Sequence, residues 1–245
     1  MVLNNVLTDI KNGQFLPVYF LHGEEPFYMD KISSLIEETT LDESQKDFNQ
    51  TILYGPDTSI EEIVNIAKRY PMMAPYQVVI VKEAQHLSRN IEKLLSYVEH
   101  LVPTTVLVLC YKNKTLDKRK ALGKYLAKQK WLFDCLSLKD YQLNDWVVNY
   151  AKAKGLGVEP KAAILLAEFI GNDLSGISSA VSKLEVLVGE KKIITADLVH
   201  KNIGFSKDYN IFELQNALSE KNVFKANKII YHFSKNKKKY PFAVT

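Results

Sequence analysis

The sequence predicts an α/β fold in which a domain built on a parallel sheet is followed by helices alone. In residues 1–140, short runs rich in Val, Ile and Leu alternate with helical segments. These runs lack polar alternation, which is typical of parallel strands that helices bury on both faces. From residue 141 only helical periodicity remains. We therefore expect a sheet domain over 1–140, a small helical domain over 141–207, and the beginning of a third, helical domain over 208–245.

The first domain is expected to contain five strands that alternate with helices. Ser59 is a favourable N-cap, and Glu61 and Glu62 place carboxylates in the first helical turn, so a helix should begin after Ser59. The expected strands are 18–21, 49–54, 78–82, 106–110 and 132–136. The expected helices are 2–12, 26–39, 60–69, 91–102 and 117–129.

Capping and breaking residues define the expected helices after residue 140. Asn144 and Asp173 are candidate N-caps, Pro160 favours a first helical position, and Thr195 begins a short helix. Gly155 follows the first of these helices, as is common at helix ends. The expected helices are 145–153, 160–169, 173–188, 195–203 and one that begins near residue 211.

Composition excludes several classes of protein. Of the 245 residues, 47% are hydrophobic and 24% are charged, as in ordinary globular proteins. No apolar run approaches the roughly 20 residues of a membrane helix, and residues 1–13 lack the pattern of a signal peptide. Cys110 and Cys135 lie in expected strands, where a free cysteine behaves as a small buried hydrophobic residue. We expect a cytoplasmic protein without disulfides or membrane contact.

An expected strand, a turn and a helix start follow one another in residues 16–31, in the arrangement of a phosphate-binding P-loop. A functional P-loop needs a second glycine followed by Lys and Ser or Thr, which bind phosphate and Mg²⁺. Here the turn carries Gly23, Glu24, Glu25 and Pro26. Two carboxylates would face the phosphate, and the proline lacks an N–H donor. We expect this degenerate P-loop not to bind a nucleotide.

Three further positions of a P-loop ATPase lack the expected residue. Lys82 ends a strand where an aspartate would bind Mg²⁺, so only Glu83 remains there. A Lys-Asn-Lys sequence over 112–114 replaces the polar sensor, and Leu174 stands where a helix of the second domain would offer an arginine. The 5 histidines show no ligand spacing, and no Ser or Cys has the sequence signature of a catalytic triad. The sequence predicts no catalytic residue, no metal and no cofactor.

Two consecutive methionines, Met72 and Met73, follow Tyr70 and are bracketed by Pro71 and Pro75. Neighbouring residues of a helix lie about 100° apart, so two consecutive methionines cannot both face one core. The prolines favour a stiff loop or a single turn. Methionine is unbranched and polarizable, which suits a shallow groove on a partner. The alternative is that both methionines are core residues at a helix end.

Basic residues are concentrated between residues 112 and 130, although the net charge is only +4. A second run, 235–239, contains four lysines. Such clusters are typical of a solvated helix face, and they also suit a surface that faces phosphate groups of DNA without sequence preference. The candidate DNA-facing residues are Lys112, Lys114, Lys118, Arg119 and Lys120.

The ordered set of motifs resembles the AAA+ clamp-loader family, and within it the delta subunits of bacterial DNA polymerase III. The segments that carry the resemblance are YFLHGEEPFYMDK (19–31), YPMMAPYQVVIVKEAQHL (70–87), LDKRKALGKYL (116–126), GNDLSGISSAVSKLEVL (171–187) and NIFELQNAL (210–218). The resemblance implies an AAA+-like sheet domain, a helical lid domain and a helical collar domain. Because the sequence ends at Thr245, we expect a truncated collar that assembles poorly with other subunits.

The resemblance also implies a function. Members of this family do not hydrolyse ATP; they bind the ring-shaped sliding clamp, the beta subunit, and help to open it for loading onto primed DNA. ATPase and other clamp-loader subunits, contacted through the collar, supply the ATP cycle. The implied complex is the DNA polymerase III holoenzyme, which is classed with DNA-directed DNA polymerase, a nucleotidyltransferase. The resemblance places the clamp-binding tip at Met72 and Met73, which Tyr70, Pro71 and Pro75 flank.

Two other functions stay open from the residues. An active P-loop ATPase is disfavoured because Lys and Ser or Thr are missing from the turn after Gly23. A DNA-binding adaptor of the AAA+ fold that does not act on a clamp would use the basic residues between 112 and 130.

Overall fold

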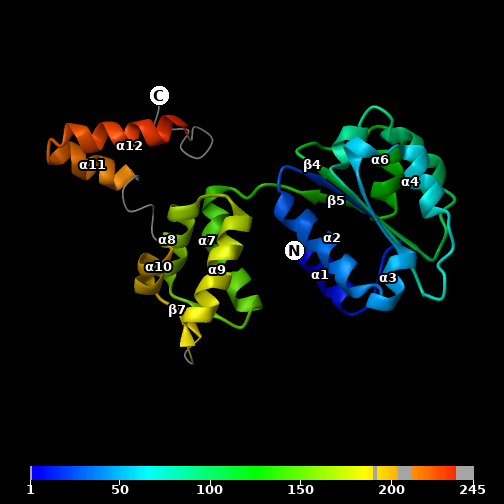
Figure 1. The fold of residues 1–245 in the computed structure, drawn as a ribbon, viewed down its shortest axis with the longest axis horizontal. Helices are drawn as coiled ribbons and strands as arrows, with labels where there is room; N and C mark the ends of the chain where they lie inside the picture. The colour runs from blue at the N-terminus through cyan, green and yellow to red at the C-terminus, as the bar shows by residue number, and fades with distance from the viewer. Residues whose placement is uncertain (1, 190–191, 204–210, 236–245) are drawn as a thin grey trace. The chain divides into compact units, whose positions relative to one another are not determined.

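The protein divides into two compact units, Met1–Ser137 and Leu138–Thr245 (Figure 1). The computed structural model describes residues 2–189, 192–203 and 211–235. The first unit contains a five-stranded sheet in the order β2-β3-β4-β1-β5, and every strand pair is parallel. The predicted α/β class, with a parallel sheet domain followed by helices, is confirmed.

The sheet places the carboxyl ends of its strands along one edge, because all five strands run in the same direction. In the register, Gly23 lies level with Lys112, and Tyr54 lies level with Lys82. Two of the interior strands, β1 and β4, therefore end side by side. The strands are β1 Val18–Gly23, β2 Gln50–Tyr54, β3 Gln77–Lys82, β4 Thr105–Lys112 and β5 Leu132–Cys135.

Helices bury both faces of the sheet, so the first unit has three layers (Figure 1). One core cluster joins α1 and α2 to one face, and another joins α4, α5 and α6 to the opposite face. The α-helices are α1 Val2–Lys11, α2 Pro26–Thr39, α3 Glu43–Asn49, α4 Ile60–Ala67, α5 Leu95–Val98 and α6 Ala121–Lys128. Short 3-10 helices are η1 Gly55–Asp57, η2 Ala84–Leu87 and η3 Ile91–Leu94.

Three predictions for the first unit were wrong in detail. The helix expected over 117–129 begins only at Ala121, because Asp117 accepts the Arg119 N–H at 2.9 Å in a local turn that competes with helix. The helix expected over 91–102 is split into η3 and α5. Helix α3 was not predicted, although Asp42 N–H donates to Gln45 Oε1 at 3.3 Å, half of a capping box.

The second unit is mainly helical, as predicted, with one small two-stranded sheet that was not predicted. Its first helix begins at Asp140, because Lys139 N–H donates to Gln142 Oε1 at 3.0 Å; Asn144 is therefore not the cap. The elements are α7 Asp140–Ala153, β6 Gly157–Val158, α8 Pro160–Ile170, α9 Leu174–Leu187, β7 Ile193–Ile194, α10 Ala196–Asn202, α11 Ile211–Ser219 and α12 Val223–Lys235.

The last segment contains two helices, where the sequence suggested one. Ala217 of α11 packs with Ala226, Ile229 and Phe233 of α12 in a cluster of buried residues. The domain boundary expected at 207–208 and the lysines of 236–239 lie outside the described residues. Among the helices that the structure describes, none combines the length and apolarity needed to cross a membrane.

Gly23 lies where the backbone of β1 approaches the end of β5 most closely. Its φ is 136°, in the region that favours glycine. Gly23 N–H donates to the Lys114 carbonyl at 2.9 Å, and Glu25 N–H donates to the Cys135 carbonyl at 3.0 Å. A Cβ atom on Gly23 would lie 2.1 Å from the Cys135 carbonyl oxygen. The turn after β1 therefore requires glycine for space as well as for conformation.

We expect Gly23→Ala to lower the free energy of unfolding by roughly 3 kcal/mol or more, since the substitution combines a backbone clash with an unfavourable φ. Gly13→Ala is the matched control: Gly13 has a φ of 73° with open space around its Cβ position. The control substitution should lower the free energy of unfolding by about 1–2 kcal/mol, which is the cost of the unfavourable φ alone. Urea denaturation of both variants measures the difference. Equal losses would show that the contact with Cys135 relaxes freely.

Candidate protein-interaction site

The turn after β1, where a P-loop would bind phosphate, is filled by the protein's own carboxylate. Glu25 is buried, and its Oε1 accepts the Phe27 N–H at 3.0 Å as the N-cap of α2. A helix N-terminus is the usual position for a bound phosphate, and here a side chain takes it. Glu24 is exposed, and Pro26 is the first residue of α2. Of the two carboxylates expected to face the phosphate position, Glu25 contacts the helix end.

Two lysines lie at the carboxyl ends of β3 and β4, and both form ion pairs with neighbouring carboxylates. Lys82 Nζ lies 3.5 Å from Glu37 Oε2. Lys112 Nζ lies 2.8 Å from Asp30 Oδ1 and 3.4 Å from Glu83 Oε1. Burial lowers the pKa of Lys112, but its two carboxylate partners outweigh burial and raise the pKa overall. Fixed positive charge therefore occupies the edge of the sheet where an ATPase would hold Mg²⁺.

Further side chains complete this closed edge. His22 is buried; its Nδ1 accepts the Leu116 N–H at 3.3 Å, and its Nε2 lies 3.2 Å from Asp134 Oδ1. Burial lowers the pKa of His22, so the imidazole is neutral at pH 7. Among the described residues, no group of three or more His, Cys, Asp or Glu side chains could hold a metal ion. These contacts link β1, β5 and the segment before α6 at this edge of the sheet.

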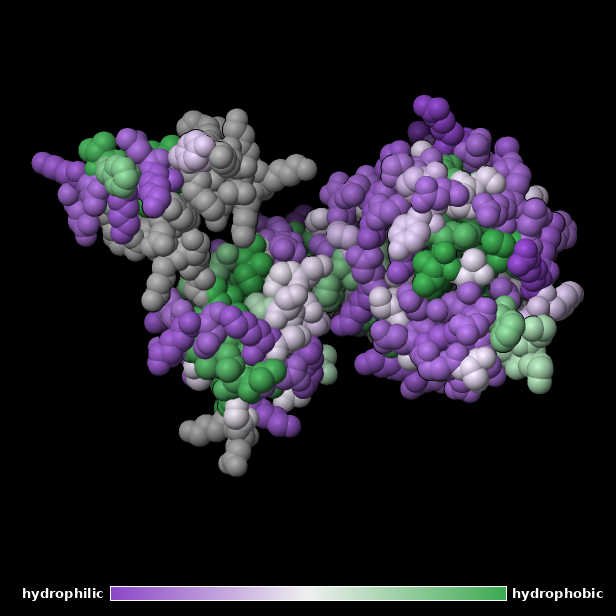
Figure 2. All heavy atoms as spheres, in the orientation of Figure 1, coloured by the Kyte–Doolittle hydropathy of each residue, from purple (hydrophilic) through white to green (hydrophobic). Residues whose placement is uncertain are grey.

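The loop between α4 and β3 presents large apolar side chains to solvent. The exposed fraction is 94% for Met73, 55% for Met72 and 79% for Tyr70. Helix α4 ends at Ala67, so the methionines do not belong to a helix end, and their exposure excludes the core interpretation. Figure 2 shows a projection in hydrophobic colour at the edge of the first unit, where Figure 1 draws this loop. Pro75 is exposed and Pro71 is half-buried.

The unpredicted helix α3 holds this loop. Asn49 Oδ1 accepts the Met72 N–H at 2.6 Å, and Asn49 Nδ2 donates to the Met72 carbonyl at 3.0 Å. Gln45 Nε2 donates to the Met73 carbonyl at 3.4 Å. Sequence reasoning missed both residues, because they precede the loop by more than 20 positions and no short-range motif links them. The capping pattern of Asp42 and Gln45 was the available signal for the helix.

Another large apolar side chain is exposed on the helix that holds the loop. Phe48 of α3 is largely exposed and lies three residues after Gln45, so the two residues share a face of the helix. Gln45 reaches the Met73 carbonyl from that face. Phe48 therefore joins Met72, Met73 and Tyr70 as a candidate contact residue that sequence reasoning did not find.

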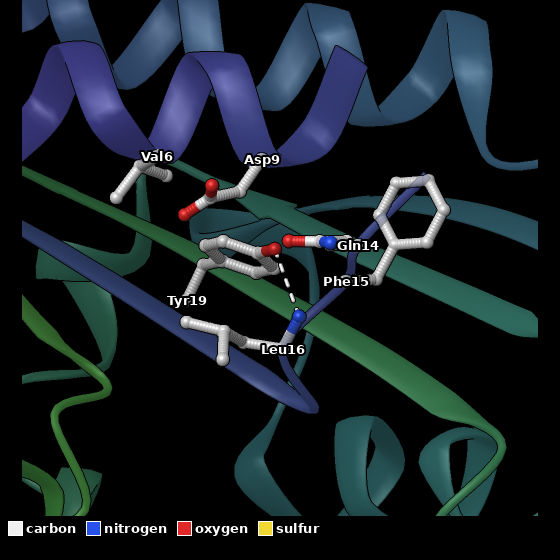
Figure 3. A pocket seen from close by; sticks show the side chains of 6 residues that line it. All are labelled: Val6, Asp9, Gln14, Phe15, Leu16 and Tyr19. Carbon is white, nitrogen blue, oxygen red and sulfur yellow. Dashed lines mark hydrogen bonds between the residues drawn. The ribbon is translucent and has the colours of Figure 1, made fainter. Parts of the chain in front are cut away.

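A cavity of about 170 Å³ lies beside α1 (Figure 3). In Figure 3 the Tyr19 ring lies between Asp9 and Leu16, and Leu16 N–H donates to the Tyr19 hydroxyl at 2.9 Å. Burial raises the pKa of Tyr19 to about 12, so the phenol supplies no base at neutral pH. The lining residues are Val6, Asp9, Gln14, Phe15, Leu16 and Tyr19. The Phe15 ring also contacts the Tyr76 ring edge-on, with 5.4 Å between the ring centroids. This contact anchors the end of the loop between α4 and β3, which we call the methionine loop.

Ion pairs neutralise much of the expected DNA-facing cluster. Besides Lys112, Lys118 Nζ lies 2.7 Å from Asp134 Oδ2, and Arg119 pairs with Asp117 at 3.0 Å. Lys114 Nζ donates to Ser88 Oγ at 3.2 Å, and Lys120 forms no ion pair with a described residue. The five residues are therefore not equivalent, and their contact with DNA stays a prediction.

Comparisons with known proteins agree with one another. Residues 19–136 match the family model described as "DNA polymerase III, delta subunit". The DNA polymerase III subunit delta of Bacillus subtilis (strain 168) is 29% identical over 240 residues, which cover 94% of this chain and 69% of that protein. The probable DNA polymerase III subunit delta of Aquifex aeolicus (strain VF5) is 26% identical over 227 residues, 87% of this chain and 62% of that protein.

A solved structure is similar as well. The Bacillus subtilis DNA clamp loader delta protein superimposes with a TM-score of 0.76 at 29% sequence identity. The match covers 96% of this chain and 72% of that chain. The similarity thus extends over both units of this chain.

We expect isothermal titration of the protein with Mg²⁺–ATP to give no binding heat, because Glu25 occupies the helix end and Lys82 and Lys112 occupy the metal position. Glu25→Gln is an informative control, since it removes the charge while retaining an acceptor for the Phe27 N–H. The variant should still not bind, because the lysine of a P-loop is missing, and it should lose about 1 kcal/mol of stability at the helix N-terminus. Micromolar affinity of the unmodified protein would contradict the prediction.

Proposed function

This chain belongs to the family of DNA polymerase III delta subunits, and from that premise we propose that it binds a sliding clamp and helps to open it during loading onto primed DNA. The chain is a relative of clamp-loader delta subunits over both of its units. Clamp binding, ATPase partners contacted through the collar, and primed DNA within the complex are parts of the proposal. The proposed role is that of a noncatalytic subunit.

The exposed methionine loop is the observation that supports clamp binding most directly. Met72 and Met73 present two flexible apolar side chains on a loop that Asn49 holds at the Met72 backbone and that the Phe15–Tyr76 ring contact holds at its end. Exposed apolar side chains on a constrained loop are typical of interface hot spots, which dock into a groove of the partner. Methionine suits a shallow apolar groove because its thioether chain adapts to irregular surfaces. We assign this loop to the groove of the clamp.

The closed carboxyl edge of the sheet supports the noncatalytic part of the proposal. Glu25 caps α2, and Lys82 and Lys112 are bound to carboxylates, so this edge of the sheet offers a nucleotide neither a free helix end nor a metal position. A protein without an ATP cycle can shift a clamp toward its open form only by binding the open form more tightly than the closed form. The proposal therefore assigns clamp opening to binding energy at the methionine loop, and ATP turnover to other subunits.

A second candidate function, DNA binding without clamp binding, is favoured by one surface. Lys120, Lys124 and Lys128 are exposed at spacings of four residues; Lys120 is the N-cap of α6, and Lys124 and Lys128 share a face of the helix. None of the three forms an ion pair with a residue that the structure describes. A row of unpaired lysines can bind phosphate groups without sequence preference. The two functions can be separated by mutation, because these lysines and the methionine loop lie on different parts of the chain.

We expect Met72→Ala/Met73→Ala to weaken binding to the purified sliding clamp by about 100-fold or more, since truncating one hot-spot residue commonly costs roughly 2 kcal/mol or more. The melting temperature should stay within a degree or so, because both side chains are exposed. Val186→Ala removes another exposed apolar side chain and should leave clamp affinity unchanged. Surface plasmon resonance measures all three proteins. Unchanged affinity in the double variant would remove this loop from the interface.

We expect replacement of Lys120, Lys124 and Lys128 by Gln to weaken binding to duplex DNA and to reduce the salt dependence of log K by roughly 3, about one for each lost phosphate contact. Lys118→Gln is the matched control, because Lys118 is already paired with Asp134 and should contribute less. Fluorescence anisotropy at several salt concentrations measures the slopes. Equal slopes for the triple variant and the unmodified protein would exclude this face of α6.

A further inference from the structure

We propose that Asn49 is a positioning residue for the clamp contact: its side-chain amide fixes the backbone of residue 72 and thereby presents Met72 and Met73 to the partner. The inference rests on the proposed function of the methionine loop. Asn49 is the last residue of α3, and 23 positions separate it from Met72. The Asn49 side chain is thus a long-range tether between one helix and the tip of a distant loop.

Asn49 binds the backbone of residue 72 with both its side-chain carbonyl and its side-chain NH₂ group. Its Oδ1 accepts the Met72 N–H at 2.6 Å, and its Nδ2 donates to the Met72 carbonyl at 3.0 Å. Nδ2 also donates to the Gln45 carbonyl at 3.0 Å within α3. A side-chain amide has one carbonyl acceptor and two N–H donors, so these contacts match its donors and fix its orientation. The side-chain amide thus pairs with both the N–H and the carbonyl of residue 72, as the backbone of a neighbouring β-strand would.

Burial makes this tether strong. Asn49 is 1% exposed, so water does not compete for its amide group. Hydrogen bonds shielded from water are stronger electrostatically than exposed ones, and breaking one side leaves a buried polar group unsatisfied. The Met72 side chain is more than half exposed although its backbone is held this way. The residue therefore combines a fixed backbone with an available side chain, as a binding tip requires.

The conformation of Met73 shows why such a tether is needed. Its φ is 53°, in the left-handed region that residues other than glycine rarely occupy. Asn49 holds the preceding residue, Gln45 reaches the Met73 carbonyl at 3.4 Å, and Ala74 packs against the core. Without Asn49, the loop would gain backbone freedom that binding would then have to remove. Preorganisation of this kind raises affinity by lowering the cost of ordering at the interface.

The test compares Asn49→Ala, Asn49→Asp and the control Asn12→Asp in the full chain. Asn12 is exposed, so its variant reproduces the charge change without the tether. Asn49→Asp retains an acceptor for the Met72 N–H but turns a carboxylate oxygen toward the Met72 carbonyl. Two quantities are measured for each protein: the hydrogen exchange rate of the Met72 amide, and the affinity for the purified sliding clamp. Each substitution at Asn49 is also combined with Met72→Ala/Met73→Ala.

We expect Asn49→Ala to raise the exchange rate of the Met72 amide at least tenfold beyond any change at Val79, a buried residue of β3 that reports global stability. Clamp affinity should fall by about tenfold, ~1.4 kcal/mol, in both variants at Asn49 and stay unchanged in Asn12→Asp. In the background without the two methionine side chains, Asn49→Ala should change affinity less than twofold, because Asn49 acts through them.

Three results would overturn the proposal. One is unchanged clamp affinity in a folded Asn49→Ala protein. Another is a loss of the same size with and without the methionine side chains, which would make Asn49 an independent contact or a general stability residue. The third is Met72 amide exchange that does not respond to the substitution. If the unmodified protein does not bind the clamp, the proposed function itself fails, and the exchange measurement still reports separately whether Asn49 holds the loop.

Discussion

Burial of the central sheet on both faces is the constraint on which the rest of the first unit depends. Helices α1 and α2 cover one face, and α4, α5 and α6 cover the other, so β1, β3 and β4 are almost fully buried. Side chains that face a core are committed to packing. Strand ends, loops and the outer faces of the helices are left to carry polar chemistry or partner contacts. Both the closed carboxyl edge and the methionine loop follow from this restriction.

The closed edge shows how side chains of the protein itself can occupy the positions that phosphate and a metal ion take in a P-loop ATPase. A helix N-terminus attracts an anion, and Glu25 provides that anion from within the chain. The neighbouring strand ends carry Lys82 and Lys112, which pair with Glu37, Asp30 and Glu83. Charged groups of the chain thus contact one another and the helix end at this edge of the sheet.

Much of the fold could be predicted from the sequence, because strong local signals determine it. Apolar runs located the strands of the main sheet, and Ser59 caps the helix that it was expected to cap. The two prolines and the repeated methionine favoured a loop but left a core position for Met72 and Met73 open, and the structure shows both exposed. The tether of Asn49 could not be predicted, because a contact across 23 residues depends on where α3 lies. The ion pairs of Lys118 and Arg119 likewise depend on side-chain geometry.

The tether at Asn49 also bears on how this surface can evolve. Asn49 binds the N–H and carbonyl groups of residue 72, which every amino acid except proline provides in full. The shape of the loop therefore does not depend on which side chain stands at position 72. Position 73 is more restricted, since its left-handed backbone disfavours Val, Ile and Thr. Within that limit, the apolar residues of the loop can be exchanged as the surface of a partner changes, while Asn49 keeps the loop backbone in the same conformation.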